Sequence, residues 1–311
     1  MIIIGIDIGG TFIKCGIVSN DGEIIVKDKI PTEKEQPYQY IANNMAKLIT
    51  RLEKASGITV QGVGIGCPGS IDSEKGVVVY TNNIAWKNIP LKAELEKLLG
   101  IPVKITNDAN AAALGEYSLI KDKHKSMIFV TLGTGVGGGI ILDGKLFEGY
   151  KSAGAEIGHQ VIKVNGEKCT CGRKGCFEAY SSTTALIRQA KSAMQKDKDS
   201  LLWQECGNDL DKLNGISFFS AYDKKDKTAE RVFDKYIKYL AEGLVNVANI
   251  FRPEIILIGG GVSAQGEKIL KPLKRKFNAL LYGGAKYAKV ELDIAKLQND
   301  AGIIGAALLH E

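Results

Sequence analysis

The chain opens with short apolar runs that are separated by glycine-rich turns. Residues 2–7 and 12–19 are two such runs, and the sequence Asn-Asp-Gly at 20–22, a strong hairpin turn, leads into a third at 23–30. Apolar runs of this length bounded by turn residues predict strands. We therefore expect the chain to begin with a meander of three strands.

A second pattern, with apolar residues three or four positions apart, predicts helices. Between residues 37 and 55 the spacing of Ile41, Met45, Leu48 and Leu52 is typical of an amphipathic helix. Further along the chain the patterns predict strands at 60–66, 103–106, 127–132, 136–142, 145–147 and 254–258, and helices at 91–99, 109–116, 183–194, 210–214, 228–251, 268–277 and 300–309. Because strands alternate with helices, we expect an α/β class with mixed sheets.

The first strand–turn–strand unit occurs twice. Gly9 and Gly133 are 124 positions apart, and the Asp-Gly pairs at 21–22 and 143–144 are 122 apart. Such a repeat predicts two similar αβ halves, each offering a glycine loop to a shared cleft. A polar stretch at 117–126 marks the expected boundary. It gives an N-terminal lobe of residues 1–120 and a larger C-terminal lobe of residues 121–311, whose last helix is able to pack back on the first lobe.

Length and composition narrow the class of protein. A chain of 311 residues predicts two domains, and 45% hydrophobic with 24% charged residues is ordinary for a globular protein. The 41 basic residues are scattered among 35 acidic ones, which argues against nucleic-acid binding. No apolar run approaches the ~20 residues of a membrane helix. Six cysteines without a disulfide framework, and an N-terminus that resembles a strand more than a secretory leader, predict a cytoplasmic location.

Three glycine turns offer backbone N–H groups that suit phosphate oxygens. They are Asp7-Ile8-Gly9-Gly10-Thr11, Gly133-Thr134-Gly135 and Gly259-Gly260-Gly261. The first two repeat each other, whereas the third is also explained as a plain strand-to-helix turn. Asp7 would hold Mg²⁺ against nucleotide phosphates, or else accept N–H groups of its own turn. A Rossmann fingerprint is excluded at Gly137–Gly139, because the next residues form a strand and not a helix.

A cluster of metal-ligating residues lies in the C-terminal half. Cys169, Cys171 and Cys176 fall within eight residues, and His159 lies ten residues upstream of the first. Three thiolates and one imidazole are the ligand set of a structural Zn²⁺ site, because four protein ligands leave no open position. The alternative is three reduced surface cysteines. Cys206 and the other two histidines are isolated and are interpreted as incidental.

Polar residues at one strand end suggest catalysis. Asn107-Asp108 follows a strand and precedes a helix, which is a usual place for catalytic groups in α/β proteins. Asp108 would be the general base for phosphoryl transfer to an alcohol, or would merely cap the helix. Glu156, His159 and Glu178 flank the cysteine loop and are natural partners for sugar hydroxyls. Taken alone, each of these three residues is equally well interpreted as a solvated residue on the surface.

These motifs together resemble the ROK family of sugar kinases, most of all its bacterial glucokinases. The resemblance covers the chain from Ile4 to Leu309. In chain order it is carried by Asp7-x-Gly9-Gly10-Thr11, Gly66-x-Pro68-Gly69, Asn107-Asp108-Ala109-Asn110, Gly133-Thr134-Gly135-x-Gly137-Gly138-Gly139, Glu156-x-Gly158-His159 and Cys169-x-Cys171-Gly172-x-x-Gly175-Cys176-x-Glu178. The zinc loop with Glu-x-Gly-His is specific, whereas the glycine turns alone are not. The family also contains repressors with an N-terminal helix-turn-helix, a branch that the start of this chain at the Asp7 strand disfavours.

The resemblance implies an actin-like, ribonuclease-H-type fold of two lobes that binds ATP and Mg²⁺, with a structural Zn²⁺. It implies that Asp108 activates a sugar hydroxyl and that His159 uses one ring nitrogen for zinc and the other for the sugar. The implied sugar-binding residues are Gly69, Asn82, Asn107, Asp108, Glu156, His159 and Glu178, and the implied ATP-binding residues are Asp7, Gly9, Gly10, Thr11, Lys14, Gly133, Thr134, Gly135, Gly260 and Gly261. Gln160 departs from the small or β-branched residues usual after Gly-His.

The expected activity is ATP-dependent phosphorylation of a hexose, most of all glucose to glucose 6-phosphate, by a homodimer. Kinases for N-acetylmannosamine, mannose or fructose stay open, because hexose epimers differ at a single hydroxyl. A non-catalytic sugar-sensing regulator is the alternative from another class, and an actin-like filament protein a further one. Polyphosphate in place of ATP also stays open.

Overall fold

The computed structural model describes residues 1–81, 83–284 and 286–311. Contacts along the backbone group the chain into two compact units. Unit 1 contains Met1–Phe129, Gly138–Ala155 and Lys296–Glu311, and unit 2 contains Val130–Gly137 and Glu156–Ala295. Each unit is therefore built from separate stretches of the chain. The division into lobes at residue 120 stays a prediction.

Unit 1 is built around a five-stranded sheet of order β3-β2-β1-β4-β8. Strand β1 pairs antiparallel with β2 and parallel with β4, and β4 pairs parallel with β8. The strands are β1 (Ile3–Ile8), β2 (Phe12–Val18), β3 (Ile24–Pro31), β4 (Gly62–Cys67) and β8 (Val103–Asn107). The three strands predicted at the N-terminus thus form the expected antiparallel meander.

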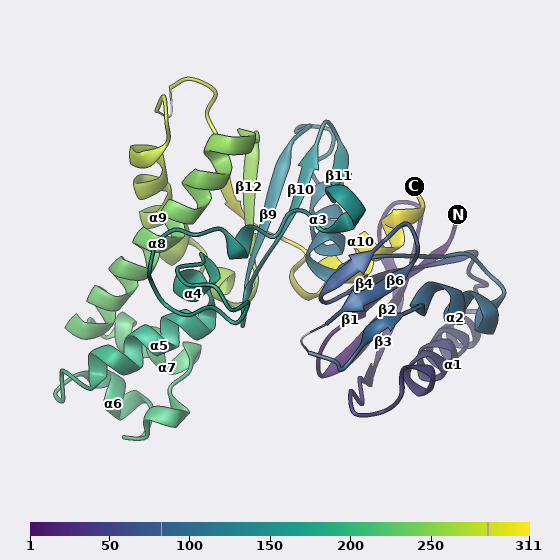
Figure 1. The fold of residues 1–311 in the computed structure, drawn as a ribbon, viewed down its shortest axis with the longest axis horizontal. Helices are drawn as coiled ribbons and strands as arrows, with labels where there is room; N and C mark the ends of the chain where they lie inside the picture. Colours follow the sequence, from purple (N-terminus) through teal and green to yellow (C-terminus); the bar gives the residue numbers. More distant parts are fainter. Residues whose placement is uncertain (82, 285) are drawn as a thin grey trace. The chain divides into compact units, whose positions relative to one another are not determined.

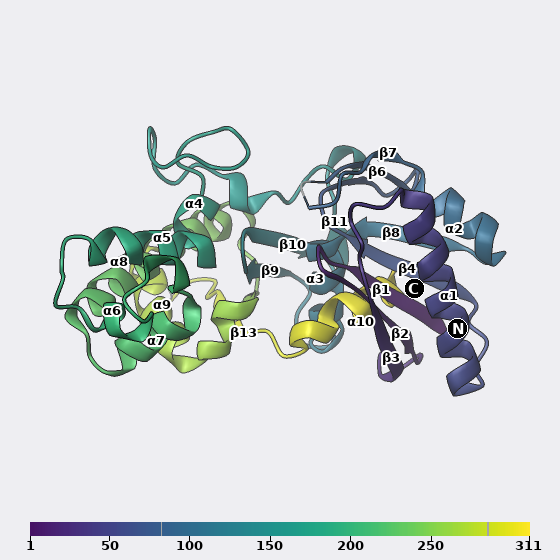
Figure 2. The ribbon, with the colours of Figure 1, turned by 90° about the horizontal axis from the view of Figure 1, so that it is seen from below.

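Helices cover both faces of this sheet, as Figure 2 shows. The helices are α1 (Tyr38–Ser56), α2 (Leu91–Leu99), α3 (Asp108–Ser118) and α10 (Ala301–Ala307). Alternate residues of a strand point to opposite faces, so Ile4 and Ile6 pack in the core with α1 and α2 while Ile3 packs against Ile303 of α10. Gly5 permits this close approach, because a Cβ there would lie 1.8 Å from the carbonyl oxygen of Ile303.

A second sheet repeats the order of the first. It is β11-β10-β9-β12-β13, with β10 and β11 antiparallel and β12 and β13 parallel (Figure 1). The strands are β9 (Met127–Leu132), β10 (Val136–Leu142), β11 (Lys145–Phe147), β12 (Ile255–Gly259) and β13 (Glu291–Ile294). Both sheets thus have an antiparallel pair of strands at one edge and a parallel pair at the other. The duplicated αβ halves predicted from the repeat are therefore confirmed.

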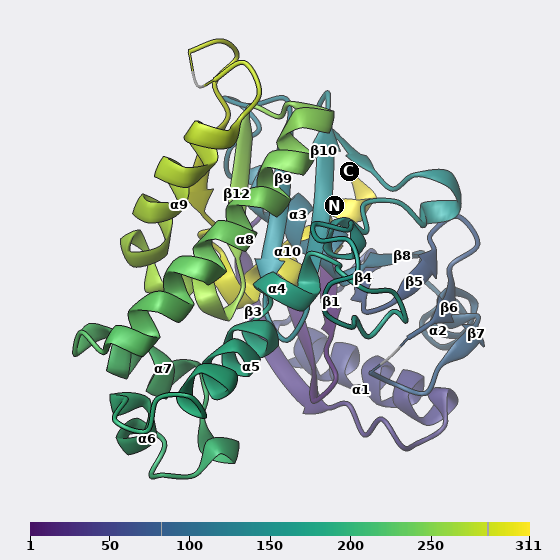
Figure 3. The ribbon, with the colours of Figure 1, turned by 60° about the vertical axis from the view of Figure 1, so that its left-hand side comes forward.

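Unit 2 is mostly helical. The helices are α4 (Glu178–Ser181), α5 (Thr183–Met194), α6 (Leu201–Glu205), α7 (Gly215–Asp223), α8 (Lys227–Phe251) and α9 (Glu267–Leu280). Figure 3 shows α5, α7 and α8 grouped together, and α8 also packs against α4 and α9. Asp226 caps the start of the long α8, since its side chain accepts the N–H of Ala229, and Arg252 follows the last residue of the helix in the left-handed conformation. Four other helices of unit 2, α4, α5, α7 and α9, pack against α8.

Several short elements differ from the sequence-based expectation. A three-stranded sheet, β5 (Ser70–Asp72), β6 (Val77–Tyr80) and β7 (Lys87–Ile89), was not predicted, nor were α6, α7 and β13. The helix predicted at 210–214 is only a 3₁₀ turn, η3 (Leu210–Lys212). The remaining 3₁₀ turns are η1 (Tyr150–Ser152), η2 (Ile157–His159), η4 (Gly261–Gln265), η5 (Gln298–Asp300) and η6 (Leu308–His310). None of the helices in the described ranges combines the length and apolar character needed to cross a bilayer.

Candidate active site

The junction of β8 and α3 places Asn107 and Asp108 as predicted, but it assigns the helix cap to Asn107. The Asn107 side-chain oxygen accepts the N–H groups of Ala109 at 2.8 Å and Asn110 at 3.3 Å. Asp108 is the first residue of the helix, and its Oδ1 accepts the N–H of Ala109 at 2.9 Å. Asn is among the best capping residues, so Asn107 alone explains the start of the helix and Asp108 is not required as its cap.

Gly69 lies directly beside Asn107. The Asn107 Nδ2 donates to the Gly69 carbonyl at 3.0 Å, which leaves the amide one further N–H and no unused lone pair. Gly69 has a φ of +96°, and a Cβ there would lie 2.1 Å from the carbonyl oxygen of Tyr80. The loop after β4 therefore needs glycine at this position. Asn107 is able to donate to a ligand but not to accept from one.

A carboxylate supports the end of β8. Glu148 Oε1 accepts the hydroxyl of Thr106 at 2.6 Å and that of Ser73 at 2.8 Å. Thr106 directly precedes Asn107, so this contact fixes the strand end that presents Asp108. Nothing in the local sequence indicated it, because Glu148 is 42 positions from Thr106 and 75 from Ser73.

The first glycine turn lies in unit 1, between β1 and β2. Asp7, at the end of β1, forms an ion pair with Lys14 of β2, with Lys14 Nζ 3.1 Å from Asp7 Oδ2. The Gly9 N–H donates to the Phe12 carbonyl at 3.0 Å within the turn. Phosphate oxygens would therefore be bound by the N–H groups after Gly9 and not by that of Gly9. One carboxylate oxygen of Asp7 is therefore already paired with the Lys14 ammonium group.

The second glycine turn lies in unit 2 and is tied to Glu178. Gly133 repeats the behaviour of Gly9, because its N–H is used inside the turn, on the Gly135 carbonyl at 3.0 Å. Glu178 Oε2 accepts the N–H of Val136 at 3.0 Å. A Cβ on Gly135 would lie 2.4 Å from that oxygen. Glycine at 135 therefore leaves the room that Glu178 occupies.

The third turn ends β12. Gly260 has a φ of +82°, and a Cβ there would lie 2.5 Å from the Leu132 carbonyl oxygen. Gly261 begins the 3₁₀ turn η4, and the Ser263 hydroxyl donates back to the Gly260 carbonyl at 2.7 Å. The backbone path explains the glycine at 260 by itself. Phosphate binding at this turn stays a prediction.

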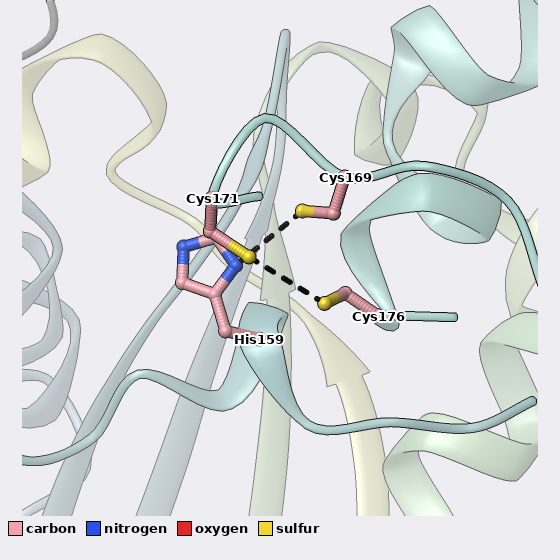
Figure 4. Close-up of side chains that lie close together, drawn as sticks. All are labelled: His159, Cys169, Cys171 and Cys176. Carbon is pink, nitrogen blue, oxygen red and sulfur yellow. Dashed lines mark hydrogen bonds between the residues drawn. The ribbon is translucent and has the colours of Figure 1, made fainter. Parts of the chain in front are cut away.

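Figure 4 shows the four predicted metal ligands gathered in unit 2. The ligand atoms of His159, Cys169, Cys171 and Cys176 all lie within 4.8 Å of one another. His159 Nδ1 is 3.6 Å from Cys169 Sγ, and the Sγ atoms of Cys171 and Cys176 are 3.7 Å apart. Sulfurs about 2.3 Å from a tetrahedral zinc ion would be about 3.8 Å apart. The residues present therefore fit a four-coordinate zinc ion.

The loop that carries the cysteines is shaped by its glycines. Gly172 and Gly175 have φ values of +89° and +85°, and a Cβ on Gly175 would lie 1.8 Å from the Lys163 carbonyl oxygen. Burial raises the pKa of Cys176 to about 12, whereas a hydrogen bond from the backbone of Arg173 lowers the pKa of the exposed Cys171. A bound cation would favour the thiolate form of all three cysteines.

Glu178 connects this loop to the second glycine turn. Its Oε1 accepts the hydroxyl of Thr170 at 3.2 Å and lies 3.6 Å from Cys169 Sγ, while its Oε2 accepts the N–H of Val136. Both oxygens of the carboxylate therefore already contact unit 2. The sequence indicated Glu178 as a sugar ligand but not as this link.

Glu156 and His159 flank the short turn η2. Glu156 is exposed and precedes the turn, and His159 ends it. With Nδ1 directed at Cys169, the other ring nitrogen of His159 is left for a second partner. Gln160 follows and donates from Nε2 to the Gly243 carbonyl of α8 at 3.0 Å. Asn82, a further predicted sugar ligand, lies outside the described residues.

The remaining cysteines are also free thiols. Cys15 and Cys67 are fully buried in strands β2 and β4. Burial raises the pKa of Cys67 well above its usual range, and the carboxylates of Asp108 and Asp7 raise it further. Cys67 is therefore a neutral thiol beneath the strand ends and no candidate nucleophile.

The chain belongs to the ROK family. The family model described as "ROK family" matches residues 3–311. A glucokinase of Halalkalibacterium halodurans is 40% identical over 98% of this chain and 94% of its own length. A xylose repressor of Caldicellulosiruptor bescii is 30% identical over 97% of this chain and 76% of its own length.

Solved structures agree with this assignment. The crystal structure of a ROK family glucokinase from Streptomyces griseus in complex with glucose and AMPPNP superposes with a TM-score of 0.85. It is 35% identical in sequence, and the alignment covers 99% of both chains. The actin-like sugar kinase fold that the resemblance implied is therefore confirmed.

Proposed function

We propose that the chain is an ATP-dependent hexose kinase that converts glucose to glucose 6-phosphate. The observation that carries the proposal is the β8–α3 junction, where Asn107 takes the capping role and Asp108 presents a carboxylate at a strand end. The similarity to glucokinases over nearly the whole chain supports glucose as the substrate.

In the proposed reaction Asp108 is the general base. Its carboxylate accepts the proton of the attacking sugar hydroxyl as that oxygen forms a bond to the γ-phosphorus. The bond between the γ-phosphorus and the bridging oxygen breaks, and ADP leaves with the electron pair. Glu148 supports the step indirectly, since it holds Thr106 and with it the end of β8.

Sugar hydroxyls would be bound by both hydrogen-bond donors and hydrogen-bond acceptors. The unused N–H of Asn107 donates to a hydroxyl oxygen, and the exposed Glu156 accepts from hydroxyls. His159 offers the ring nitrogen that does not face Cys169. Glu178 is proposed as the fourth partner, and Gly69 as part of the lining.

The nucleotide would be bound at the glycine turns. N–H groups of Gly10, Thr11, Thr134 and Gly135 suit phosphate oxygens, and the Lys14 ammonium adds a positive charge. The Asp7 carboxylate is an oxygen ligand of the type that Mg²⁺ prefers, and its second oxygen is not engaged by Lys14. Mg²⁺, when bound, neutralises charge on the transferred phosphate.

The four-ligand cluster is proposed to hold a structural zinc ion. It would fix His159 and, through Cys169 and Thr170, the side chain of Glu178. We also propose that the protein is a homodimer and is located in the cytoplasm. Both proposals come from the sequence.

A hexose panel tests the proposal. The purified chain is assayed with ATP and Mg²⁺ on glucose, mannose, fructose and N-acetylmannosamine, and again with polyphosphate as donor. We expect glucose with ATP to give the highest kcat/KM. Sugar binding without turnover of any hexose would instead favour the sugar-sensing regulator, a class represented by the xylose repressor that this chain resembles.

A further inference from the structure

Gln160 joins three elements of unit 2. Its Nε2 donates to the carbonyl of Gly243 in α8 at 3.0 Å, across 83 positions of sequence. Its own carbonyl accepts the N–H of Phe177 at 2.8 Å, and its N–H donates to the Ile157 carbonyl of η2 at 3.3 Å. The half-buried Gln160 is therefore bonded on the side chain, the carbonyl and the amide.

Gly243 explains why α8 accepts this contact. It is buried in the middle of the helix, where glycine is unfavourable. A Cβ there would lie 2.2 Å from the ring of Phe177, so the glycine lets the ring lie directly against the helix. A backbone carbonyl has two lone pairs, and a helical hydrogen bond uses one. The Gln160 amide takes up the other.

The two residues joined to α8 are each next to a proposed site residue in the chain. Gln160 follows His159 directly, and Phe177 lies between the zinc ligand Cys176 and Glu178. Contacts of Gln160, Phe177 and Gly243, which we call the Gln160 joint, thus connect the chain next to His159 and the chain next to Glu178 to one long helix. The joint uses none of the zinc ligand atoms.

We propose that Gln160 is a positioning residue that fixes the turn carrying Glu156 and His159 and thereby sets hexose discrimination. The inference rests on the proposed function. Discrimination between epimers needs hydroxyl partners held at fixed positions, because a small displacement weakens the contacts that separate one epimer from another. The proposed zinc ion would hold the His159 ring, while the Gln160 joint holds the backbone that follows it.

The test uses two substitutions with different physical effects. Gln160→Leu replaces the polar amide by an apolar side chain of nearly the same size. Gln160→Glu keeps the shape of the side chain but places an oxygen acceptor, in place of the N–H donor, next to the Gly243 carbonyl. Both lose the donated hydrogen bond. The matched control is Gln189→Leu in the same unit, because the half-buried Gln189 also donates from Nε2 to backbone carbonyls, those of Tyr180 and Ala185.

We expect both Gln160 variants to raise KM for glucose roughly threefold to tenfold, which is the worth of one neutral hydrogen bond. The ratio of kcat/KM for glucose to that for mannose should fall by a similar factor. In contrast, kcat, KM for ATP and the zinc content should stay within about twofold of the unaltered chain. Gln189→Leu should change neither KM for glucose nor the ratio.

Three results would overturn the inference. The first is an unchanged glucose-to-mannose ratio in both variants, and the second is a loss confined to Gln160→Leu, which would indicate packing and not the donated bond. If Gln160→Leu fails to fold, the isosteric Gln160→Glu decides alone. The third, absence of turnover of every hexose by the unaltered chain, would overturn the proposed function and this inference with it.

Discussion

Asn107 caps the helix that begins with Asp108. The Asn107 side-chain oxygen accepts two N–H groups of the first turn, so the neighbouring carboxylate is not required for that role. Capping of the helix and the proposed catalytic role therefore fall on two different residues. Capping and catalysis should therefore respond to different substitutions.

Replacing Asp108 by Asn should abolish most activity while preserving the fold. The amide keeps an oxygen for the Ala109 N–H but cannot accept the substrate proton. We expect kcat to fall by ~10²–10⁴. The loss of a negative charge at the helix N-terminus should cost less than about 1 kcal/mol of unfolding free energy. A near-normal kcat would remove Asp108 from the mechanism.

Substitutions of Asn107 should affect stability by their hydrogen-bonding capacity. Asn107→Ala removes the cap and should lower the unfolding free energy by about 0.5–2 kcal/mol. Asn107→Asp keeps the acceptor and should retain most of that stability, although it loses the donation to Gly69. Denaturant unfolding measures both. Equal destabilisation by the two variants would show that the Gly69 contact matters more than the cap.

One zinc ion per chain should accompany the protein through purification without added metal. Cys171→Ala should release it and raise KM for glucose, because the loop positions His159 and contacts Glu178. Elemental analysis and kinetics measure the two effects. Cys206→Ala is the control, since Cys206 lies outside the cluster. An active protein free of zinc would contradict this prediction.

Alanine at Gly135 should weaken sugar binding, whereas alanine at the nearby Gly133 should not. A methyl group at 135 would lie 2.4 Å from Glu178 Oε2, whereas nothing lies within 4 Å of one at 133. Gly135→Ala should displace Glu178 and weaken glucose binding, measured by calorimetry without nucleotide. Gly133→Ala should leave that binding intact. If both variants bind glucose normally, Glu178 is not a sugar partner.

Glu116 should be essential for the stability of unit 1. Its side chain is 1% exposed and accepts the N–H groups of Lys296 and Leu297 at 2.8 and 2.7 Å. Glu116→Ala removes the acceptor of two part-buried N–H groups and should cost roughly 1–3 kcal/mol in denaturant unfolding, the worth of two hydrogen bonds. Glu53→Ala, which removes a single part-buried contact to the Val60 N–H, should cost less than about 1 kcal/mol.

Much of the fold was predictable because its signals are local. The meander strands, α1 and the Asp-Gly turns show their period or turn chemistry within a few residues. Strand β13 could not be predicted, since its four residues become a strand only by pairing with β12, about 35 positions earlier in the chain. The short strands β5–β7 are equally dependent on their neighbours. Helix α7 was missed because it is only nine residues long and its aromatic residues, Phe218, Phe219 and Tyr222, are also typical of strands.

The same distinction applies to the candidate site. The cysteine loop and Asn107-Asp108 were predictable, because each is compact in sequence and each residue type has a clear chemistry. Glu148 was missed, and Gln160 could be singled out but not explained. Both act through partners more than forty positions away, and sequence spacing carries no information about such contacts.

The late position of α10 has a consequence for biosynthesis. Gly5 and Gly64 belong to strands made early, yet the helix that covers them begins only at residue 301. At ~5–20 residues per second, the ribosome needs roughly 15–60 s to add the residues between. During that time the part of the sheet face that α10 will cover stays exposed. Chaperone binding should therefore concentrate on this face and end when the last helix leaves the ribosome.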